Sequence, residues 1–430
     1  MYNIYMNKVY PIKNIQQATN IINTFILNNK LEEKYSLNRM AKLMDYLDNP
    51  QNKLKIIHIA GTSGKTSTCY YTASLLHKAG YSVGLTVSPH IDKINERVQI
   101  NLIPLEENQY CKELNQFLKI IYQSKIKPTY FEFLIAFAFW VFNKYKLDYA
   151  VIEVGIGGLL DATNIINRND KICIITDIGI DHTEILGNTI TSIAFQKAGI
   201  IQKGNLVFMN QQEKKVLKVI IEIAHKKNAS LKIVKLSKYI DTLENKHNFA
   251  IFQKRNFNLA LETVKYLLKI NHKNKLPLKE INSAIKIHIP GRMEIIKYNN
   301  TTIILDGSHN EQKISTLVKS IQQMFPNKSI ALLISFGENK NSRINKSLEI
   351  LKLLSLNIII TSFSYNNDNF RLAINPKDLS EYAKIVGFKN IRIENNPTKA
   401  FDLLNKTDTN IKLVTGSFYL LNYIRPIVIK

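Results

Sequence analysis

Cysteine is scarce in this 430-residue chain, and its three cysteines, Cys69, Cys111 and Cys173, form no CxxC pair and no ligand spacing with histidine. An odd and sparse set argues against a disulfide framework and is typical of a reducing compartment. The N-terminus also lacks a secretory pattern, because no apolar core of the right length follows its first basic residues. We therefore expect a cytoplasmic protein.

Long hydrophobic runs are missing as well. The most apolar stretch, 131–142, is interrupted by Glu132 and is too short to span a bilayer, so we expect no membrane contact. There is no internal repeat and no low-complexity linker. Hydrophobic residues make up 45% and charged residues 21%, which is ordinary for a soluble globular protein long enough for two or three domains.

Acidic residues are few: the chain has 34 aspartates and glutamates against 58 lysines and arginines, and its formal net charge is +24. Such a balance attracts anions and can support nucleic-acid binding. The lysines are scattered, however, with no arginine-rich arm and no module that interleaves aromatic and basic residues. Compositional drift together with anionic small-molecule substrates is the favoured interpretation, and a basic nucleic-acid-binding P-loop protein is the alternative.

Patterns typical of strands and of helices alternate along the chain. The apolar run 54–60 is typical of a buried parallel strand, and a helix over 65–78 follows it and ends at Gly80. After Pro290-Gly291-Arg292 the pattern restarts with a hairpin turn at Asn299-Asn300. Further strands are predicted at 83–87, 149–154, 172–177, 206–209, 330–335, 358–362 and 412–415. The alternation predicts an α/β protein with two parallel sheets and with domains at 1–289 and 290–430.

The sharpest local motif lies between the first predicted strand and its helix. A glycine-rich turn at this point binds phosphate through backbone N–H groups and the helix N-terminus, while a lysine meets the terminal phosphates and a threonine can ligate Mg²⁺. The gap between its glycines is two residues shorter than in the common P-loop. The turn consists of Gly61, Thr62, Ser63, Gly64, Lys65 and Thr66.

Three further turns follow predicted strands, at the edge where ligands bind in open α/β sheets. They carry Ser88, Glu153 and His182. Carboxylate and hydroxyl oxygens suit Mg²⁺, and imidazole can complete such a site, so these residues and Thr66 form a candidate metal site. Each of them alone is more often structural, and their joint placement at strand ends is what favours a site.

Two turns in the second half have the same strand-turn-helix form. Asp306 could bind a ribose hydroxyl or a metal-bound water, and His309 could hydrogen-bond a substrate. The alternative is an N-capping turn, for which Asn310 is suited. The N–H groups around Ser417 could bind a carboxylate.

Taken in order, these turns resemble the folylpolyglutamate synthase / dihydrofolate synthase branch of the Mur ligases. The resemblance covers nearly the whole chain, and several motifs in one order are a specific signal where a single motif is weak. They are Leu37-Asn38-Arg39-Met40, Ile57 to Thr62, Ser88-Pro89-His90 with Glu96-Arg97, Phe131-Glu132, Glu153 to Asn164, Asp181-His182-Thr183 with Leu186-Gly187, Lys197 to Ile200, Pro290-Gly291-Arg292, Asp306 to Asn310 and Val414 to Ser417.

The resemblance implies a P-loop NTPase-like parallel-sheet domain followed by a smaller Rossmann-like α/β domain. It also implies that ATP phosphorylates a pteroate or folate carboxylate, and that the amino group of L-glutamate attacks the acyl phosphate to give an amide, ADP and phosphate. The implied cofactors are ATP and Mg²⁺, the implied partners are these small molecules alone, and the implied state is a monomer.

Residue roles follow from the same resemblance. It assigns catalysis to Lys65, Lys197 and His309, and Lys197 matches a lysine that the family carbamylates. It places nucleotide contacts at the glycine-rich turn and at Asn258, Arg292 and Asp306. Metal ligands or their neighbours are assigned to Thr66, Ser88, Glu153 and His182, and substrate contacts to Asp161, Ala162, His309 and Ser417.

Three departures from the family pattern stand in this chain. The turn has Ser63-Gly64-Lys65-Thr66 where the family usually has Asn-Gly-Lys-Gly, Leu159 replaces an arginine, and Gln196 replaces a glutamate. They motivate a degenerate homologue as one alternative. A cell-wall Mur ligase is another, although the first predicted strand begins at residue 54, which leaves too little chain for a typical N-terminal domain. The choice between dihydropteroate and polyglutamyl substrates stays open.

Overall fold

The computed structural model describes residues 11–26, 36–237, 240, 249–338, 341–365 and 371–429. The chain divides into two compact units. The first comprises Met1–Gly61 and Ala73–Ile233, and the second comprises Thr62–Thr72 and Val234–Lys430. The division crosses helix α4 (Lys65–Lys78), so that most of the glycine-rich turn belongs to the second unit. The domain boundary near residue 290 stays a prediction.

The first unit contains an eight-stranded sheet whose central strands are parallel. Its order is β4-β3-β2-β5-β1-β6-β7-β8, and β3 and β4 form an antiparallel edge. The strands are β1 (Lys55–Ala60), β2 (Val83–Thr86), β3 (Gln99–Ile100), β4 (Ile103–Pro104), β5 (Tyr149–Glu153), β6 (Ile172–Ile175), β7 (Leu206–Asn210) and β8 (Ser230–Val234). Strands β2, β5 and β1 are buried almost throughout, as expected of parallel strands covered on both faces.

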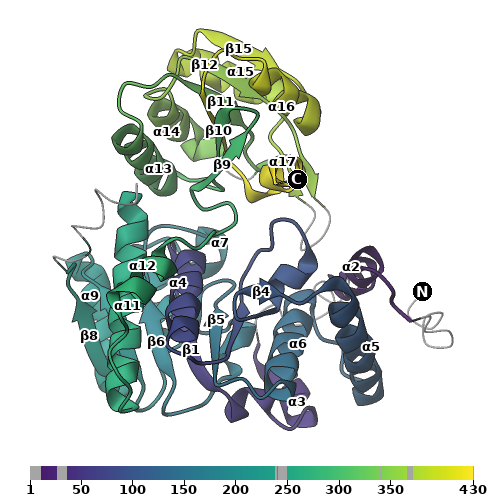
Figure 1. Cartoon of the computed structure of the whole chain (residues 1–430), viewed down its shortest axis with the longest axis vertical. Coiled ribbons are helices and arrows are strands. Elements are labelled where there is room, and N and C mark those ends of the chain that lie inside the picture. The colour runs from purple at the N-terminus through teal and green to yellow at the C-terminus, as the bar shows by residue number, and fades with distance from the viewer. Residues whose placement is uncertain are drawn as a thin grey trace. The chain divides into compact units, whose positions relative to one another are not determined.

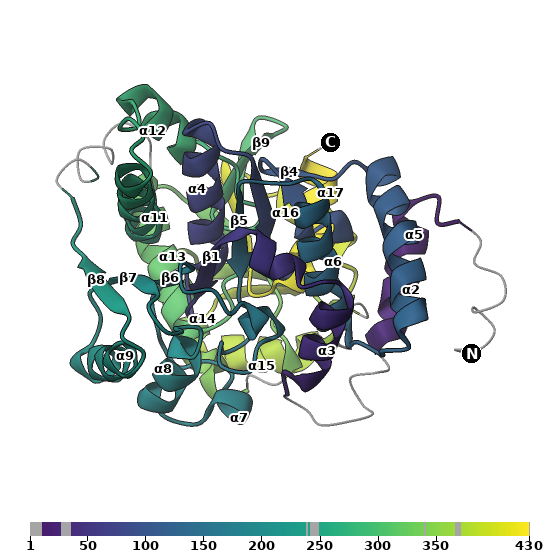
Figure 2. The ribbon, with the colours of Figure 1, turned by 90° about the horizontal axis from the view of Figure 1, so that it is seen from below.

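Two groups of helices cover this sheet. Helices α2 (Ile15–Asn23), α3 (Asn38–Tyr46), α5 (Glu107–Ser124) and α6 (Tyr130–Lys144) share one hydrophobic core with β1 and β5, and α2 lies beside α5 (Figures 1 and 2). Helices α7 (Thr183–Leu186), α8 (Ile190–Ala198) and α9 (Lys214–Lys226) share a second core with β6 and β7. The 3-10 turns η2 (Pro50–Lys53), η3 (Ile94–Arg97) and η4 (Ala162–Ile165) complete the unit.

Helix α6 shows how the sequence sets one of these elements. Thr129 caps its N-terminus, and the Glu132 carboxylate accepts a hydrogen bond from the backbone N–H of Thr129, which is a capping box. The helix is buried nearly all round, and its Phe133 and Phe137 pack edge-on and tilted against Phe117 of α5. Each buried phenylalanine contributes about 2–3 kcal/mol.

The second unit contains a six-stranded sheet of order β15-β12-β11-β16-β10-β9, in which β9 alone is antiparallel to its neighbour. Figure 1 shows α13 and α14 on one side of it and α16 and α17 on the other. The strands are β9 (Glu294–Tyr298), β10 (Thr301–Leu305), β11 (Ile330–Ile334), β12 (Asn357–Ile360), β15 (Asn390–Ile393) and β16 (Ile411–Thr415), and a separate pair is β13 (Ser364–Tyr365) with β14 (Arg371–Leu372). The helices are α11 (Ile251–Ile270), α12 (Leu278–Ile285), α13 (Glu311–Met324), α14 (Asn341–Leu351), α15 (Pro376–Val386), α16 (Pro397–Asn405) and α17 (Phe418–Val428).

An ion pair joins the first strand of this sheet to the last helix. Arg425 Nε donates to both carboxylate oxygens of Glu294, at 3.1 and 3.0 Å. The carboxylate is 2% exposed and also accepts from the backbone N–H of Gly291 at 2.9 Å. The pair therefore holds the turn before β9 against α17.

The mixed α/β class with two mainly parallel sheets confirms the predicted architecture. Within the described part of the chain, no helix is both long enough and apolar enough to cross a membrane.

Candidate functional site

The glycine-rich turn follows β1 and requires glycine at two positions. Gly61 has φ +153°, and a Cβ placed on it would lie 1.8 Å from Thr176 Oγ1. Gly64 has φ +89°, and a Cβ there would lie 2.3 Å from Asn256 Oδ1. Both the backbone conformation and the close neighbours therefore exclude a side chain. The turn therefore presents backbone without side chains at the start of α4.

The turn also offers an unsatisfied hydroxyl. Ser63 Oγ is buried and has no hydrogen-bond partner among the described residues. A buried polar atom without a partner is costly unless a ligand completes it. Because α4 begins at Lys65, within the glycine-rich turn, the helix N-terminus lies at the same point. This combination fits a bound phosphate group.

The strand ends bring two of the metal candidates together. Glu153 ends β5, and its Oε2 accepts a hydrogen bond from the backbone N–H of Ser88 at 3.0 Å. His182 is the N-cap of α7 with φ +46°, and its ring lies 3.9 Å from Asp181 Oδ2 and 3.7 Å from Glu184 Oε1.

No group of three histidine, cysteine, aspartate or glutamate side chains in the described ranges could hold a metal ion by itself. Mg²⁺ commonly takes only one or two protein carboxylates and completes its shell with water and substrate phosphates. The pairing of Ser88 with Glu153 fits that kind of site.

Lys197 lies against the glycine-rich turn. Its Nζ donates to the backbone carbonyl of Gly61 at 2.9 Å, and the residue is 3% exposed. Two of the three family departures meet at the same end of α8, since the backbone N–H of Leu159 donates to the carbonyl of Gln196 at 2.8 Å. A Cβ on Gly158 would lie 2.8 Å from that carbonyl oxygen, so the turn at Gly158 packs directly on α8.

Asp161 lies in a fully buried hydrogen-bond network. Its Oδ1 accepts from the hydroxyl of Thr163 at 2.5 Å and from the backbone N–H of Thr163 at 3.0 Å, and its Oδ2 accepts from the N–H of Ile156 at 2.9 Å. Burial raises the pKa of this carboxyl, and those hydrogen bonds oppose the shift. The carboxylate thereby closes the turn that carries both Asp161 and Ala162, the predicted substrate residues.

His58 of β1 extends the network, and the number of protons available in the network determines its tautomer. Its Nε2 lies 2.8 Å from Thr163 Oγ1, whose only proton is used by Asp161, so Nε2 must carry a proton and donate. Nδ1 is buried and has no partner among the described residues. Burial, with the charge of Lys171, holds the pKa of His58 well below 6.5, so the ring is neutral.

In the second unit, Arg292 lies beside the turn. Its Nη2 donates to Thr66 Oγ1 at 3.0 Å, and its guanidinium lies 3.9 Å from the centre of the Phe418 ring. Asp306 is buried, which raises its pKa, and it accepts hydrogen bonds from the backbone N–H groups of Met293 and Ser308, both at 2.8 Å.

The other two predicted substrate residues, His309 and Ser417, follow β10 and β16, which are neighbours in the sheet. His309 Nδ1 lies 2.8 Å from the carbonyl oxygen of Gly307, and its ring packs against Phe418. Ser417 caps α17 by accepting from the N–H of Tyr419 at 3.1 Å. The N-capping alternative also holds in part, because Asn310 caps α13.

Asn258 and Asn256 occupy different environments on α11. The amide of Asn258 accepts from the N–H of Ser237 and donates to the carbonyl of Lys235, so both of its ends bind backbone. Asn256 lies against Gly64 of the turn. The nucleotide contact of Asn258 stays a prediction, whereas Asn256, which was not singled out from the sequence, is the residue that lies against the turn. Helical geometry offers the signal, because residues two positions apart point to different faces.

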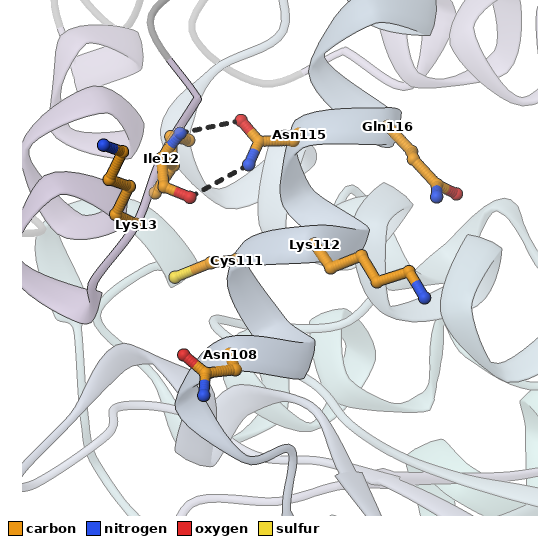
Figure 3. Close-up of a pocket in the computed structure, with 7 residues that line it drawn as sticks. All are labelled: Ile12, Lys13, Asn108, Cys111, Lys112, Asn115 and Gln116. Atoms are coloured by element: carbon orange, nitrogen blue, oxygen red, sulfur yellow. Dashed lines mark hydrogen bonds between the residues drawn. The ribbon is translucent and has the colours of Figure 1, made fainter.

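A surface pocket of about 550 Å³ lies elsewhere in the first unit (Figure 3). Asn115 of α5 bridges its wall through two hydrogen bonds of 3.0 Å to the backbone of Ile12. It contains none of the candidate residues. Its lining residues are Ile12, Lys13, Asn108, Cys111, Lys112, Asn115 and Gln116.

Comparisons with known proteins agree along the chain. The family profile "Mur ligase middle domain" matches residues 59–302, and "Mur ligase, glutamate ligase domain" matches residues 291–418. A dihydrofolate synthase/folylpolyglutamate synthase of Bacillus subtilis (strain 168) is 30% identical over 425 residues, covering 92% of this chain and 95% of that one.

Two further relatives are similar over most of their length. A dihydrofolate synthetase of Saccharomyces cerevisiae is 30% identical over 413 residues, covering 89% of this chain and 95% of that one. The crystal structure of Mycobacterium tuberculosis folylpolyglutamate synthase complexed with ADP and AMPPCP superimposes with a TM-score of 0.78 at 25% identity, covering 95% of this chain and 99% of that one.

Proposed function

Because this chain belongs to the folylpolyglutamate synthase / dihydrofolate synthase family of Mur ligases, we propose that it ligates L-glutamate to a folate-type carboxylate. The reaction consumes ATP, passes through an acyl phosphate, and releases ADP and phosphate. The acceptor is dihydropteroate, a folyl-polyglutamate, or both.

The observation that carries this proposal is the turn after β1. Its bare glycines, the buried unsatisfied hydroxyl of Ser63 and the start of α4 together fit the phosphates of ATP. Lys65 would meet the terminal phosphates, and Arg292, held at Thr66, would add a second fixed positive charge. A carboxylate is a poor electrophile until it is phosphorylated, and these charges stabilise the negative charge that builds up during phosphoryl transfer.

A divalent ion would bind beside Ser88 and Glu153 and, when bound, would neutralise phosphate charge. Asn256 is a further nucleotide contact because it lies against Gly64. Asp306 would hold the nucleotide's ribose. We propose that Lys197 acts from the buried end of α8, where it is held at the carbonyl of Gly61. Carbamylation there would turn the cation into a carboxylate.

The acceptor would contact the turn at Asp161 and Ala162, whose shape is held by the buried network of Thr163 and His58. The glutamate would lie between His309 and Ser417, which follow neighbouring strands of the second sheet. Excluding water from the acyl phosphate would favour attack by the amine over hydrolysis.

The test is ADP release by purified protein with Mg-ATP and L-glutamate, adding dihydropteroate or tetrahydrofolate in separate reactions. Glutamate-dependent turnover with either compound supports the proposal, and the responsive compound identifies the acceptor. Lys65→Met should abolish turnover, while Lys78→Met at the exposed end of the same helix serves as the control. Turnover with neither compound, in protein that still binds Mg-ATP, would refute the folate assignment.

We propose further that the enzyme works as a cytoplasmic monomer and does not use nucleic acid. The sparse buried cysteines and the scattered lysines support this. Light scattering would measure the molecular mass in solution. Tight binding of random DNA at physiological salt, with a steep salt dependence, would contradict the last point.

A further inference from the structure

We propose that Lys313 binds the side-chain carboxylate of the incoming glutamate and so sets the enzyme's preference for this amino acid. The inference rests on the proposed function. Lys313 lies in the first turn of α13, outside every motif that pointed to a site, and its side chain is half-buried.

The environment of His309 fixes where the Lys313 ammonium lies. His309 Nδ1 is 2.8 Å from a carbonyl oxygen, which can only accept, so Nδ1 carries the proton. Nε2 is then an acceptor, and Lys313 Nζ donates to it at 3.2 Å. Asn310 Oδ1 holds the backbone N–H of Lys313 at 3.0 Å. Both ends of the lysine are thus positioned next to a predicted substrate residue.

A continuous series of contacts separates this cation from the nucleotide turn. Arg292 donates to Thr66 and stacks on Phe418, which packs against His309, and His309 accepts from Lys313. Arg292 therefore stands at the phosphate end of the series and Lys313 at the opposite end. Two cations placed at the two ends match two separate anions, the phosphates of ATP and a carboxylate of the amino acid.

Two more observations indicate that an anion belongs at Lys313. A cation in the first turn of a helix is disfavoured by the helix dipole, and an anion bound there would offset this cost. Asn310 Nδ2 is also buried and has no hydrogen-bond partner among the described residues. A carboxylate could accept from both donors. Glutamate carries two carboxylates, so one of them remains for Lys313 when Ser417 and its neighbouring N–H groups take the other.

The first experiment compares Lys313→Met with Lys319→Met, a substitution of equal charge at an exposed position of the same helix. ADP release is measured against L-glutamate at saturating ATP and folate acceptor. We expect KM for L-glutamate to rise roughly 10- to 100-fold in Lys313→Met, as for loss of a charged hydrogen bond, with KM for ATP changed less than about twofold. Lys319→Met should match the wild type.

A second readout separates recognition from a structural effect. The ratio of kcat/KM for L-glutamate to that for L-glutamine should fall toward one in Lys313→Met, because the side-chain carboxylate loses its cation. Lys313→Arg should recover part of the preference. An unchanged ratio, or a rise in KM confined to ATP, would overturn the proposal.

Failure of the proposed function is distinguishable from failure of this inference. If the wild type shows no turnover, the melting temperature is measured with L-glutamate and L-glutamine in the presence of Mg-ADP. Stabilisation by glutamate that persists in Lys319→Met and disappears in Lys313→Met supports the site. Equal stabilisation of all three proteins, or of none, rules it out.

Discussion

Replacing Thr163 by valine tests the buried network that shapes the predicted substrate turn. Valine keeps the shape of the side chain and removes only the hydroxyl. That hydroxyl donates to Asp161 at 2.5 Å and accepts from His58 at 2.8 Å. The substitution therefore removes one hydrogen bond to a buried carboxylate and leaves the Nε2–H group of His58 without an acceptor.

The magnitude follows from these two losses. A hydrogen bond to a charged group contributes about 1.5–3 kcal/mol, and orphaning a buried donor costs about 1–3 kcal/mol. The His58 ring has no compensating bond, because its Nδ1 already lacks a partner among the described residues. We expect Thr163→Val to lower the free energy of unfolding by about 3–5 kcal/mol, which corresponds to a fall in melting temperature of roughly 10 °C.

The matched control is Thr163→Ser, which keeps the hydroxyl and loses one methyl group at a cost of about 1 kcal/mol. Thermal unfolding followed by circular dichroism would measure both variants at neutral pH. If valine were no more destabilising than serine, the hydroxyl would not hold this network and the tautomer assigned to His58 would be wrong.

Three other perturbations have defined outcomes. His58 stays neutral in the folded protein, so below pH 6.5 the unfolded chain takes up a proton that the folded chain does not. The free energy of unfolding, measured by urea titration, should therefore fall with decreasing pH by up to about 1.4 kcal/mol per pH unit. His58→Gln should lack this contribution to the pH dependence. Gly64→Ala should abolish Mg-ATP binding in calorimetry, because its Cβ meets Asn256. Gly80→Ala has the same positive φ but open space around the new Cβ, so this control should still bind. Arg425→Met should lower the free energy of unfolding by about 3–5 kcal/mol, since it leaves the buried carboxylate of Glu294 unpaired. An equally large destabilisation in Glu294→Gln, which removes that charge, would be inconsistent with an unpaired carboxylate as the cause.

Much of the fold was predictable because its elements carry strong local patterns. The helix predicted over 65–78 is α4 (Lys65–Lys78), with the observed ends, and the hairpin of β9 and β10 was recognised from its turn. The short antiparallel strands β3 and β4 were missed. Two-residue strands carry no periodicity, and their pairing depends on a neighbouring strand that is distant in the sequence.

Site residues in glycine-rich turns could be predicted from the sequence. Site residues on helices were harder to predict, because their role depends on which face of the helix meets the site. The glycines of the turn after β1 signal bare backbone, so Gly61 and Gly64 could be identified from residue type alone. Helical geometry places Asn256 and Asn258 on different faces of α11, but which face meets the turn is a tertiary property that the sequence does not show. Lys313 has no sequence signal at all, since its position depends on the tautomer of His309.

Helix α4 has one backbone but two sets of neighbours. Its first eight residues belong to the second compact unit and its last six to the first. Amide hydrogen exchange along this helix would therefore report two opening events in a single element, with the N-terminal amides following one unit and the C-terminal amides the other. Helix formation is cooperative, so loosening of either half weakens the other. Ligand binding at the N-terminal end of α4 would accordingly slow exchange in both units through a continuous run of peptide hydrogen bonds.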